Sequence, residues 1–172
     1  MKKKPLKRIA GRMSPGLTLI EILIAIAILA IVAGIAYPSF QRIAVNSNLK
    51  TAARDIASDF AQLKERSLSG DAALGGNRMH RLAINMAANT YQLQQCNNVG
   101  VPCGGWNTMQ VKSLANYSAD IIFDAGTNTL NYDFRPRGTA SPGNIALRNR
   151  LGSTANITIN FTGKPRVQFN LQ

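Results

Sequence analysis

One ionisable side chain, Glu21, stands inside a stretch that is otherwise apolar, apart from Thr18, over residues 17–37. A carboxylate at bilayer depth is unfavourable, so a residue of this kind generally has a function there. We therefore expect Glu21 to have a function in this segment, and nothing around it indicates catalysis.

Few residues of the chain could carry out catalysis or hold a metal ion. His80 is the only histidine, and no serine or cysteine has a histidine and an acid arranged around it as a catalytic set. Asp120, Asp124 and Asp133 lie in one region, but their spacing differs from that of an EF-hand calcium loop. We expect no enzymatic activity, no metal site and no cofactor.

The only two cysteines are Cys96 and Cys103, with Gly100 and Pro102 between them. A zinc site would need more ligands than this pair and one histidine supply. Outside the cytoplasm the two thiols are expected to form a disulfide, and closing so short a loop would stabilise the fold by about 2–3 kcal/mol. The pair is predicted to staple a loop without redox chemistry.

Positive charge gathers at both ends of the chain. Residues 1–16 carry six cations and no acid, and subtracting these from the 20 lysines and arginines leaves 14 against eight acids. The segment from Phe134 onward holds six cations and no acid: Arg135, Arg137, Arg148, Arg150, Lys164 and Arg166. Such a cluster is typical of a surface that contacts a polyanion. A solvated basic face, or one that pairs with an acidic neighbouring subunit, is the alternative.

The aromatic residues of this segment do not suggest base recognition. Phe161 and Phe169 are spaced as alternating core residues would be, so we expect no stacking on nucleobases. A nucleic acid bound here would be held weakly through its phosphates, with little sequence preference.

Two elements must position these residues, and the first is a long helix. Residues 17–37 are numerous enough for one transmembrane helix, and the preceding cations should stay in the cytoplasm. Pro38 is predicted to kink the helix, or alternatively to end it. An apolar stripe at three- and four-residue steps favours continuation to residue 69, with Gly70 as the stop. The stripe comprises Leu49, Ala52, Ala53, Ile56, Phe60 and Leu63.

The second element is a head domain over residues 70–172. Short alternating segments bounded by turn residues predict strands at 81–85, 91–94, 109–112, 121–123, 130–134, 145–148, 157–161 and 167–171. The predicted fold class is α+β, with the second half of the helix, through its apolar stripe, packed on a small antiparallel β-sheet head. Arg54, Asp55, Asp59, Lys64 and Glu65 are expected to fall mainly off that stripe.

The N-terminal pattern resembles that of type IV prepilins. Gly16 precedes an apolar residue, Leu17, and Glu21 is the fifth residue after the Gly16–Leu17 bond. Leu17 stands where these proteins usually have phenylalanine. The resemblance implies that a prepilin peptidase removes residues 1–16 as a leader and that Leu17 becomes N-methylated. It also implies that Glu21 acts in assembly: its carboxylate neutralises the free amine of a neighbouring subunit, and this charge pair fixes the register of the stacked helices.

The head resembles the GspH/FimT family of minor pilins and pseudopilins. The resemblance rests on Gly105-Trp106, on residues 134–138 (Phe-Arg-Pro-Arg-Gly) and on residues 163–166 (Gly-Lys-Pro-Arg). It implies an all-strand head on a pilin helix, in a type IV pilus or a type II secretion pseudopilus. The usual strand after the cysteines is interrupted here by Asn107-Thr108, which leaves its pairing open.

In the FimT branch of that family, a C-terminal Gly-Arg-x-Arg motif is associated with DNA binding during natural transformation. Residues 163–166 are similar, with Lys164 in place of the first arginine. The resemblance makes Lys164 and Arg166 the DNA-binding candidates, and Arg148 and Arg150 a second contact.

Three functions therefore compete. The first is a minor pilin or pseudopilin that also binds double-stranded DNA for uptake, and the second is a purely structural initiation or tip subunit of a type II secretion system. The third is an exported periplasmic enzyme whose ordinary signal peptide is cut after Ala36. The first two place the chain in the inner membrane as a single-pass protein with a periplasmic head. Its partners would be prepilin peptidase and other pilins.

Overall fold

The computed structural model describes residues 18–69, 78–98 and 103–172. The described residues divide into two separate compact units, one up to residue 40 and one over residues 41–172, and each is considered by itself. The helix α1 spans Leu19–Ser69 and includes Pro38, so the alternative that Pro38 ends the helix is wrong. The helix ends at the residue predicted; Gly70, the predicted stop, lies outside the described residues.

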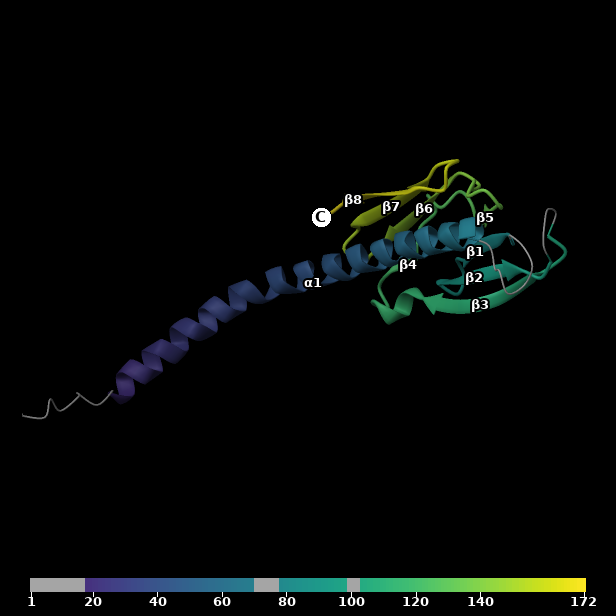
Figure 1. Cartoon of the computed structure of the whole chain (residues 1–172). Coiled ribbons are helices and arrows are strands. Elements are labelled where there is room, and N and C mark those ends of the chain that lie inside the picture. The colour runs from purple at the N-terminus through teal and green to yellow at the C-terminus, as the bar shows by residue number, and fades with distance from the viewer. Residues whose placement is uncertain (1–17, 70–77, 99–102) are drawn as a thin grey trace, which may run out of the picture. The chain divides into compact units, whose positions relative to one another are not determined.

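The N-terminal unit consists, in its described part, of the first turns of α1 (Figure 1). Its large apolar side chains are exposed on every side of the helix, from Leu19, at 81%, to Ile35, at 74%. A helix that is apolar all round is typical of a membrane span. Within the described residues, α1 is the one helix long and apolar enough to cross a membrane.

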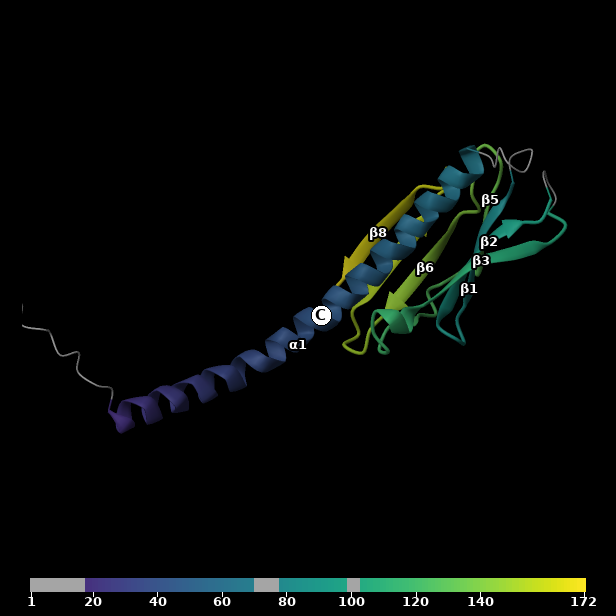
Figure 2. The same cartoon turned by 60° about the horizontal axis from the view of Figure 1, so that its bottom comes forward.

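In its described residues the head contains eight strands, arranged as two four-stranded antiparallel sheets (Figures 1 and 2). The first sheet has the order β3-β2-β1-β5 and the second the order β4-β6-β7-β8. The bounds are β1 His80–Asn85, β2 Thr90–Cys96, β3 Trp106–Ser113, β4 Ile122–Phe123, β5 Asn131–Phe134, β6 Gly143–Arg148, β7 Thr154–Ile159 and β8 Pro165–Asn170. All eight predicted strands are present within a few residues, and the predicted fold class is confirmed.

The interrupted strand after the cysteines pairs with β2 in spite of Asn107 and Thr108. These residues lie opposite Gln95 and Gln94, and the register then shifts so that Leu93 faces Gln110. Met109 is therefore the extra residue of a β-bulge, which absorbs the irregular sequence without ending the strand.

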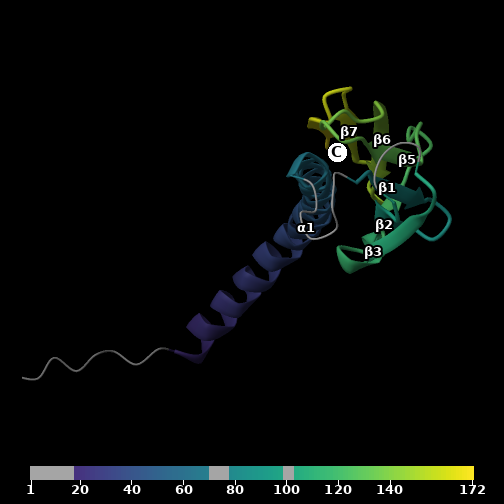
Figure 3. The same ribbon diagram turned by 45° about the vertical axis from the view of Figure 1, so that its right-hand side comes forward.

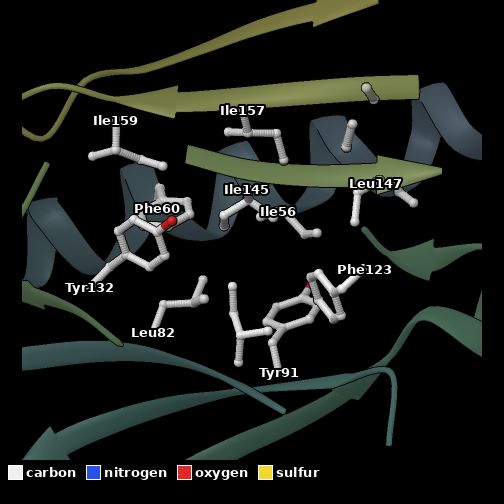
Figure 4. Packing of buried hydrophobic residues seen from close by; sticks show 14 of the residues in the cluster. Ile56, Phe60, Leu82, Tyr91, Phe123, Tyr132, Ile145, Leu147, Ile157 and Ile159 are labelled. Atoms are coloured by element: carbon white, nitrogen blue, oxygen red, sulfur yellow. The ribbon is translucent and has the colours of Figure 1, made fainter. Parts of the chain in front are cut away.

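The core lies between the inner faces of the two sheets and the buried stripe of α1. Figure 4 shows Ile145 and Ile157 of the second sheet on one side of the core and Leu82 and Tyr91 of the first sheet on the other. All six residues of the predicted helical stripe are buried, and Phe60 meets Tyr132 edge-on with ring centroids 5.2 Å apart. Residues 41–69 of α1 and both sheets thus share one core, and Figure 3 shows this part of α1 beside the strands.

Asp59, which was expected to fall mainly off the apolar stripe, is a buried charged residue of α1. Its carboxylate is buried, accepts a hydrogen bond of 2.8 Å from the Tyr91 hydroxyl and pairs with the Lys112 ammonium at 2.7 Å. Two partners from the first sheet compensate for the desolvation of the charge. The group therefore ties α1 to β2 and β3.

Candidate functional site

The start of α1 forms a reciprocal cap between Thr18 and Glu21. The Thr18 amide and hydroxyl both donate to Glu21 Oε2 at 3.1 Å, and the Glu21 amide donates to Thr18 Oγ1 at 3.3 Å. This is a capping box, which satisfies backbone donors that a helix start leaves open. Sequence reasoning missed it, although the Thr-x-x-Glu spacing is its signal.

The capping box bears on the assembly role predicted for Glu21. Both bonds from Thr18 go to Oε2, so within the described chain Oε1 is available to a further donor. The box also holds the carboxylate against Thr18, the residue that follows Leu17 of the predicted cleavage bond. Gly16 and Leu17, which form that bond, lie outside the described residues.

A cluster of cations lies where two loops of the head meet. Arg135 and Arg137 belong to the loop after β5, and Lys164 and Arg166 belong to the turn between β7 and β8 and to β8 itself. All four side chains are exposed. We call the surface formed by these four residues the basic end. Within the part of the chain that the structure describes, none of the four has an ion-pair partner.

The two loops of the basic end pack directly on each other. The Ala140 amide donates to the Phe161 carbonyl at 3.0 Å, and the Gly163 amide closes its own turn on the Asn160 carbonyl at 2.9 Å. Gly163 has a φ of +69°, and a Cβ there would lie 3.3 Å from the Gly138 carbonyl oxygen. A glycine is therefore needed at 163 both for the backbone angle and for the close approach of the loops.

The Asn160 side chain fixes the turn that presents Lys164. Its Oδ1 accepts from the Lys164 amide at 2.9 Å and from the Thr162 hydroxyl at 2.7 Å. The backbone at Lys164 is thereby held while its ammonium group remains in solvent. Glu65 of α1 lines the same shallow cavity as Lys164 and is the acid beside this part of the basic end.

Arg148 and Arg150, the predicted second contact, lie at the other end of the second sheet. Arg148 pairs across the sheet with Thr154, whereas Gly143 pairs with Ile159 next to the basic end. Six-residue strands separate the two ends by roughly 17 Å. The structure therefore does not bring the two predicted pairs of cations together.

The local charges differ at that far end as well. Arg148 lies 3.7 Å from the Asp124 carboxylate, and Arg150 lies 3.3 Å from the Asp120 carboxylate. These acids precede the basic segment in sequence, so a count of charges after Phe134 does not include them. Much of the positive potential at the far end is neutralised locally.

Phe161 is not a core residue, which corrects the sequence-based expectation. Its exposed fraction is 62%, whereas Phe169 is half-buried and packs against the core. The alternation of buried and more exposed side chains along β7 stops at Ile159, and Phe161 belongs to the turn that follows. The ring lies beside a cavity of about 100 Å³ lined by Arg135, Thr139, Ala140, Ser141, Pro142 and Phe161.

The three aspartates considered for calcium each face an arginine. Asp120 and Asp124 pair with Arg150 and Arg148, as described above. Asp133 accepts two hydrogen bonds from Arg81, at 2.5 and 3.1 Å, and the Arg81 guanidinium also stacks 4.0 Å from the centroid of the Trp106 ring. In residues 18–69, 78–98 and 103–172, no group of three histidine, cysteine or acidic side chains could hold a metal ion.

The predicted disulfide is present. Cys96, buried at the end of β2, is joined to Cys103, with Cα atoms 5.7 Å apart. The bridge closes the loop that leads into β3 at Trp106. Its position supports a structural role for the pair at the edge of the first sheet.

Residues 11–37 match the family model of the prokaryotic N-terminal methylation motif. Two solved structures of the minor pseudopilin EpsH, from the type II secretion system of Vibrio cholerae, are similar to the chain. One is 11% identical with a TM-score of 0.52 and covers 72% of this chain and 97% of its own. The other is 12% identical with a TM-score of 0.52 and covers 70% and 93%.

No curated protein matches the chain by sequence. The family-model match rests on the apolar N-terminal segment, and the structural matches, at such low identity, rest on the fold. The chain thus combines a prokaryotic N-terminal methylation motif with the fold of a minor pseudopilin.

Proposed function

We propose that this protein is a minor pilin or pseudopilin, a structural subunit of a type IV pilus or of a type II secretion pseudopilus. The observation that carries the proposal is one helix that starts within a methylation motif, is apolar on every side over its first turns and then contributes a stripe to a pseudopilin-like core. Such a chain needs an apolar environment around the first turns of its helix and water around its head.

The proposal includes processing and location. Prepilin peptidase cuts the Gly16–Leu17 bond on the cytoplasmic side, where six cations hold the leader, and Leu17 is then N-methylated. The mature subunit remains in the inner membrane through residues 17–37, with its head in the periplasm, until it enters the filament. Pro38 loosens α1 just beyond the span, because it lacks the amide that would bond to the preceding turn.

Assembly depends on Glu21 in this proposal. The capping box directs its carboxylate toward the start of the helix, where the free amine of a neighbouring subunit would meet Oε1. Replacing Glu21 by Ala should leave a processed, membrane-held subunit with a folded head that enters filaments poorly. Thr18→Ala is the matched control, because it breaks the capping box but keeps the charge, and it should retain most of the incorporation.

The experiment is a pull-down of assembled pili or pseudopili from cells that express each variant, with the amount of this subunit measured by immunoblot. Incorporation of the Glu21→Ala variant at the wild-type level would remove the role assigned to the carboxylate. Equal loss in both variants would assign the effect to the helix cap and not to the charge.

A second function, DNA contact, is favoured by one observation: the four cations of the basic end lack ion-pair partners within the described residues, whereas Arg148 and Arg150 face aspartates. Unpaired, exposed cations attract phosphates without first breaking an existing pair. We therefore assign the contact to Lys164 and Arg166 together with Arg135 and Arg137. Binding should be micromolar or weaker and should fall as salt rises, since about four phosphate contacts are available.

Two matched double variants test this assignment in an anisotropy titration with labelled DNA. Lys164→Gln with Arg166→Gln should lower the affinity and reduce the slope of log K against log salt by about 2. Arg148→Gln with Arg150→Gln removes the same charge from the far end and should change the affinity and the salt slope far less. If the wild-type chain binds no DNA well above micromolar concentrations at low salt, the purely structural alternative holds.

A further inference from the structure

Phe161 carries the most exposed aromatic ring among the described residues of the head. Among the described residues of the head, it is the only aromatic side chain in the set of largely exposed apolar residues, with 62% of its surface in solvent. Tyr91, Tyr132, Phe60 and Phe134 are fully buried. An exposed aromatic ring that lines the same cavity as Arg135 suits a ligand with both a planar apolar part and an anionic part.

The backbone that carries this ring is held in place. The Phe161 carbonyl accepts from the Ala140 amide, and the turn is closed by Asn160, whose side chain caps both Thr162 and Lys164. The ring is therefore presented by a fixed turn, and little conformational freedom is lost when a ligand packs on it.

The surroundings of the ring match a nucleotide. The adjoining cavity of about 100 Å³ is lined on its other sides by Arg135, by Thr139 and Ser141 with their hydroxyls, and by Pro142. A planar base could stack on Phe161 and direct its polar edge to the hydroxyls, while the Arg135 guanidinium contacts the neighbouring phosphate. Lys164 and Arg166 continue the positive surface from the other side of the turn.

The backbone at Arg137 supplies an independent sign of function. Its φ is +91°, in the left-handed region that favours glycine, while Gly138 follows with +74°. The Gly138 amide bonds to the Arg135 carbonyl at 3.0 Å, which closes a turn with Arg137 at a position that usually carries glycine. Strain of this kind persists where the side chain serves a purpose, and here it places a fourth exposed cation at the basic end.

We propose that the basic end binds single-stranded DNA, with an unpaired base stacked on Phe161 and the flanking phosphates on Arg135, Arg137, Lys164 and Arg166. This inference rests on the DNA contact proposed above and specifies its form. A duplex hides the faces of its bases, so it can use the four cations but not the ring. The strand state of the DNA thus separates the two contributions.

The test uses the mature chain from Leu17 onward in detergent micelles, which lacks the six leader cations. Affinities for a labelled oligo-dT strand and for a duplex are measured by anisotropy for the wild type, Phe161→Ala and Phe161→Trp. Phe161→Ala should weaken binding of the single strand roughly tenfold and leave duplex binding unchanged, because one stacked base is lost. Val111→Ala is the control, since Val111 is another exposed apolar residue, 57% in solvent, on β3 of the first sheet.

Fluorescence gives a readout that a merely structural role of Phe161 would not move. Trp106 is the single tryptophan of the chain and stacks on Arg81 in the first sheet. Oligo-dT should therefore quench the Phe161→Trp variant strongly and the wild type little, because only the new indole stacks on a base.

The outcomes separate the stacking proposal from the DNA proposal. If the wild type binds single strand and duplex with equal affinity and Phe161→Ala changes neither, the ring has no role and the cations alone bind DNA. If Phe161→Ala weakens binding of the single strand and of the duplex equally, the stacking proposal is likewise overturned. If the wild type binds neither form, the DNA contact itself fails.

Arg137→Gly should weaken binding of both the single strand and the duplex without lowering the melting temperature of the protein. This result is expected because a residue with a strained backbone is exchanged for the glycine that the turn prefers.

Discussion

Residues 19–40 and residues 41–172 differ in whether their apolar side chains are exposed or buried. In the first unit they surround the helix and remain exposed, whereas in the second most of them are buried in one core. Both patterns occur on the single element α1, which changes from all-round apolarity to a buried stripe. The difference indicates that folding of the head needs nothing from the first unit. The first unit in turn needs lipid or neighbouring subunits to cover its surface.

The largest expected effect compares two leucines on α1. Leu63 is fully buried in the head and Leu29 is 66% exposed in the first unit. Leu63→Ala should lower the free energy of unfolding of the head by about 2–5 kcal/mol, because it leaves a cavity. Leu29→Ala should leave the thermal midpoint of the head unchanged. Circular dichroism melts of both variants in detergent provide the measurement, and equal shifts would contradict the division into two units.

A smaller effect is expected from the disulfide, which belongs to the head alone. Replacing Cys96 and Cys103 by Ser should lower the stability of the head by about 2–3 kcal/mol, since the unfolded chain regains the freedom of a short loop. Denaturant unfolding measures the change, and the reduced wild-type protein is the control. Labelling of free thiols in the native, unreduced protein would contradict the bridge itself.

The smallest effect concerns alkaline pH. Burial, together with the hydrogen bond to Asp55, raises the pKa of Tyr117 to about 12, and burial with the bond to Asp59 raises the pKa of Tyr91 further. The native head keeps phenolic protons that the unfolded chain releases near pH 10. The stabilisation is therefore complete below pH 10 and is lost as the pH rises from 10 toward 12.

Melting temperatures recorded across this range should fall with pH, and less steeply for Tyr117→Phe than for the wild type. The same decline in both proteins would show that Tyr117 does not contribute to it.

The sequence was sufficient for the features that depend on local periodicity. The alternation of apolar residues predicted the eight strands, and the spacing of the stripe from Leu49 to Leu63 predicted that the helix continues through Pro38. The resemblance to pseudopilins, inferred from the N-terminal pattern and from short head motifs, is confirmed by the methylation-motif match and by the fold.

Features that depend on tertiary partners were not predictable in this way. Asp59 is buried because Lys112 and Tyr91 come from strands that lie far away in the sequence. Arg148 and Arg150 are neutralised by aspartates that the fold brings next to them. The alternation of apolar residues also does not reveal the residue at which a strand ends. Phe161 was expected in the core because β7 was predicted to continue to it, whereas the strand ends at Ile159.

The measurement that tests the central claim most directly is the N-terminus of the chain recovered from membranes. Mass spectrometry should find a mature protein that begins at Leu17 and carries one added methyl group on its amine. Such a chain keeps residues 17–37 as an anchor and can enter a filament. A mature protein that begins at Tyr37 would contradict this account, because the apolar segment would then be a removed signal peptide and the head a free periplasmic domain.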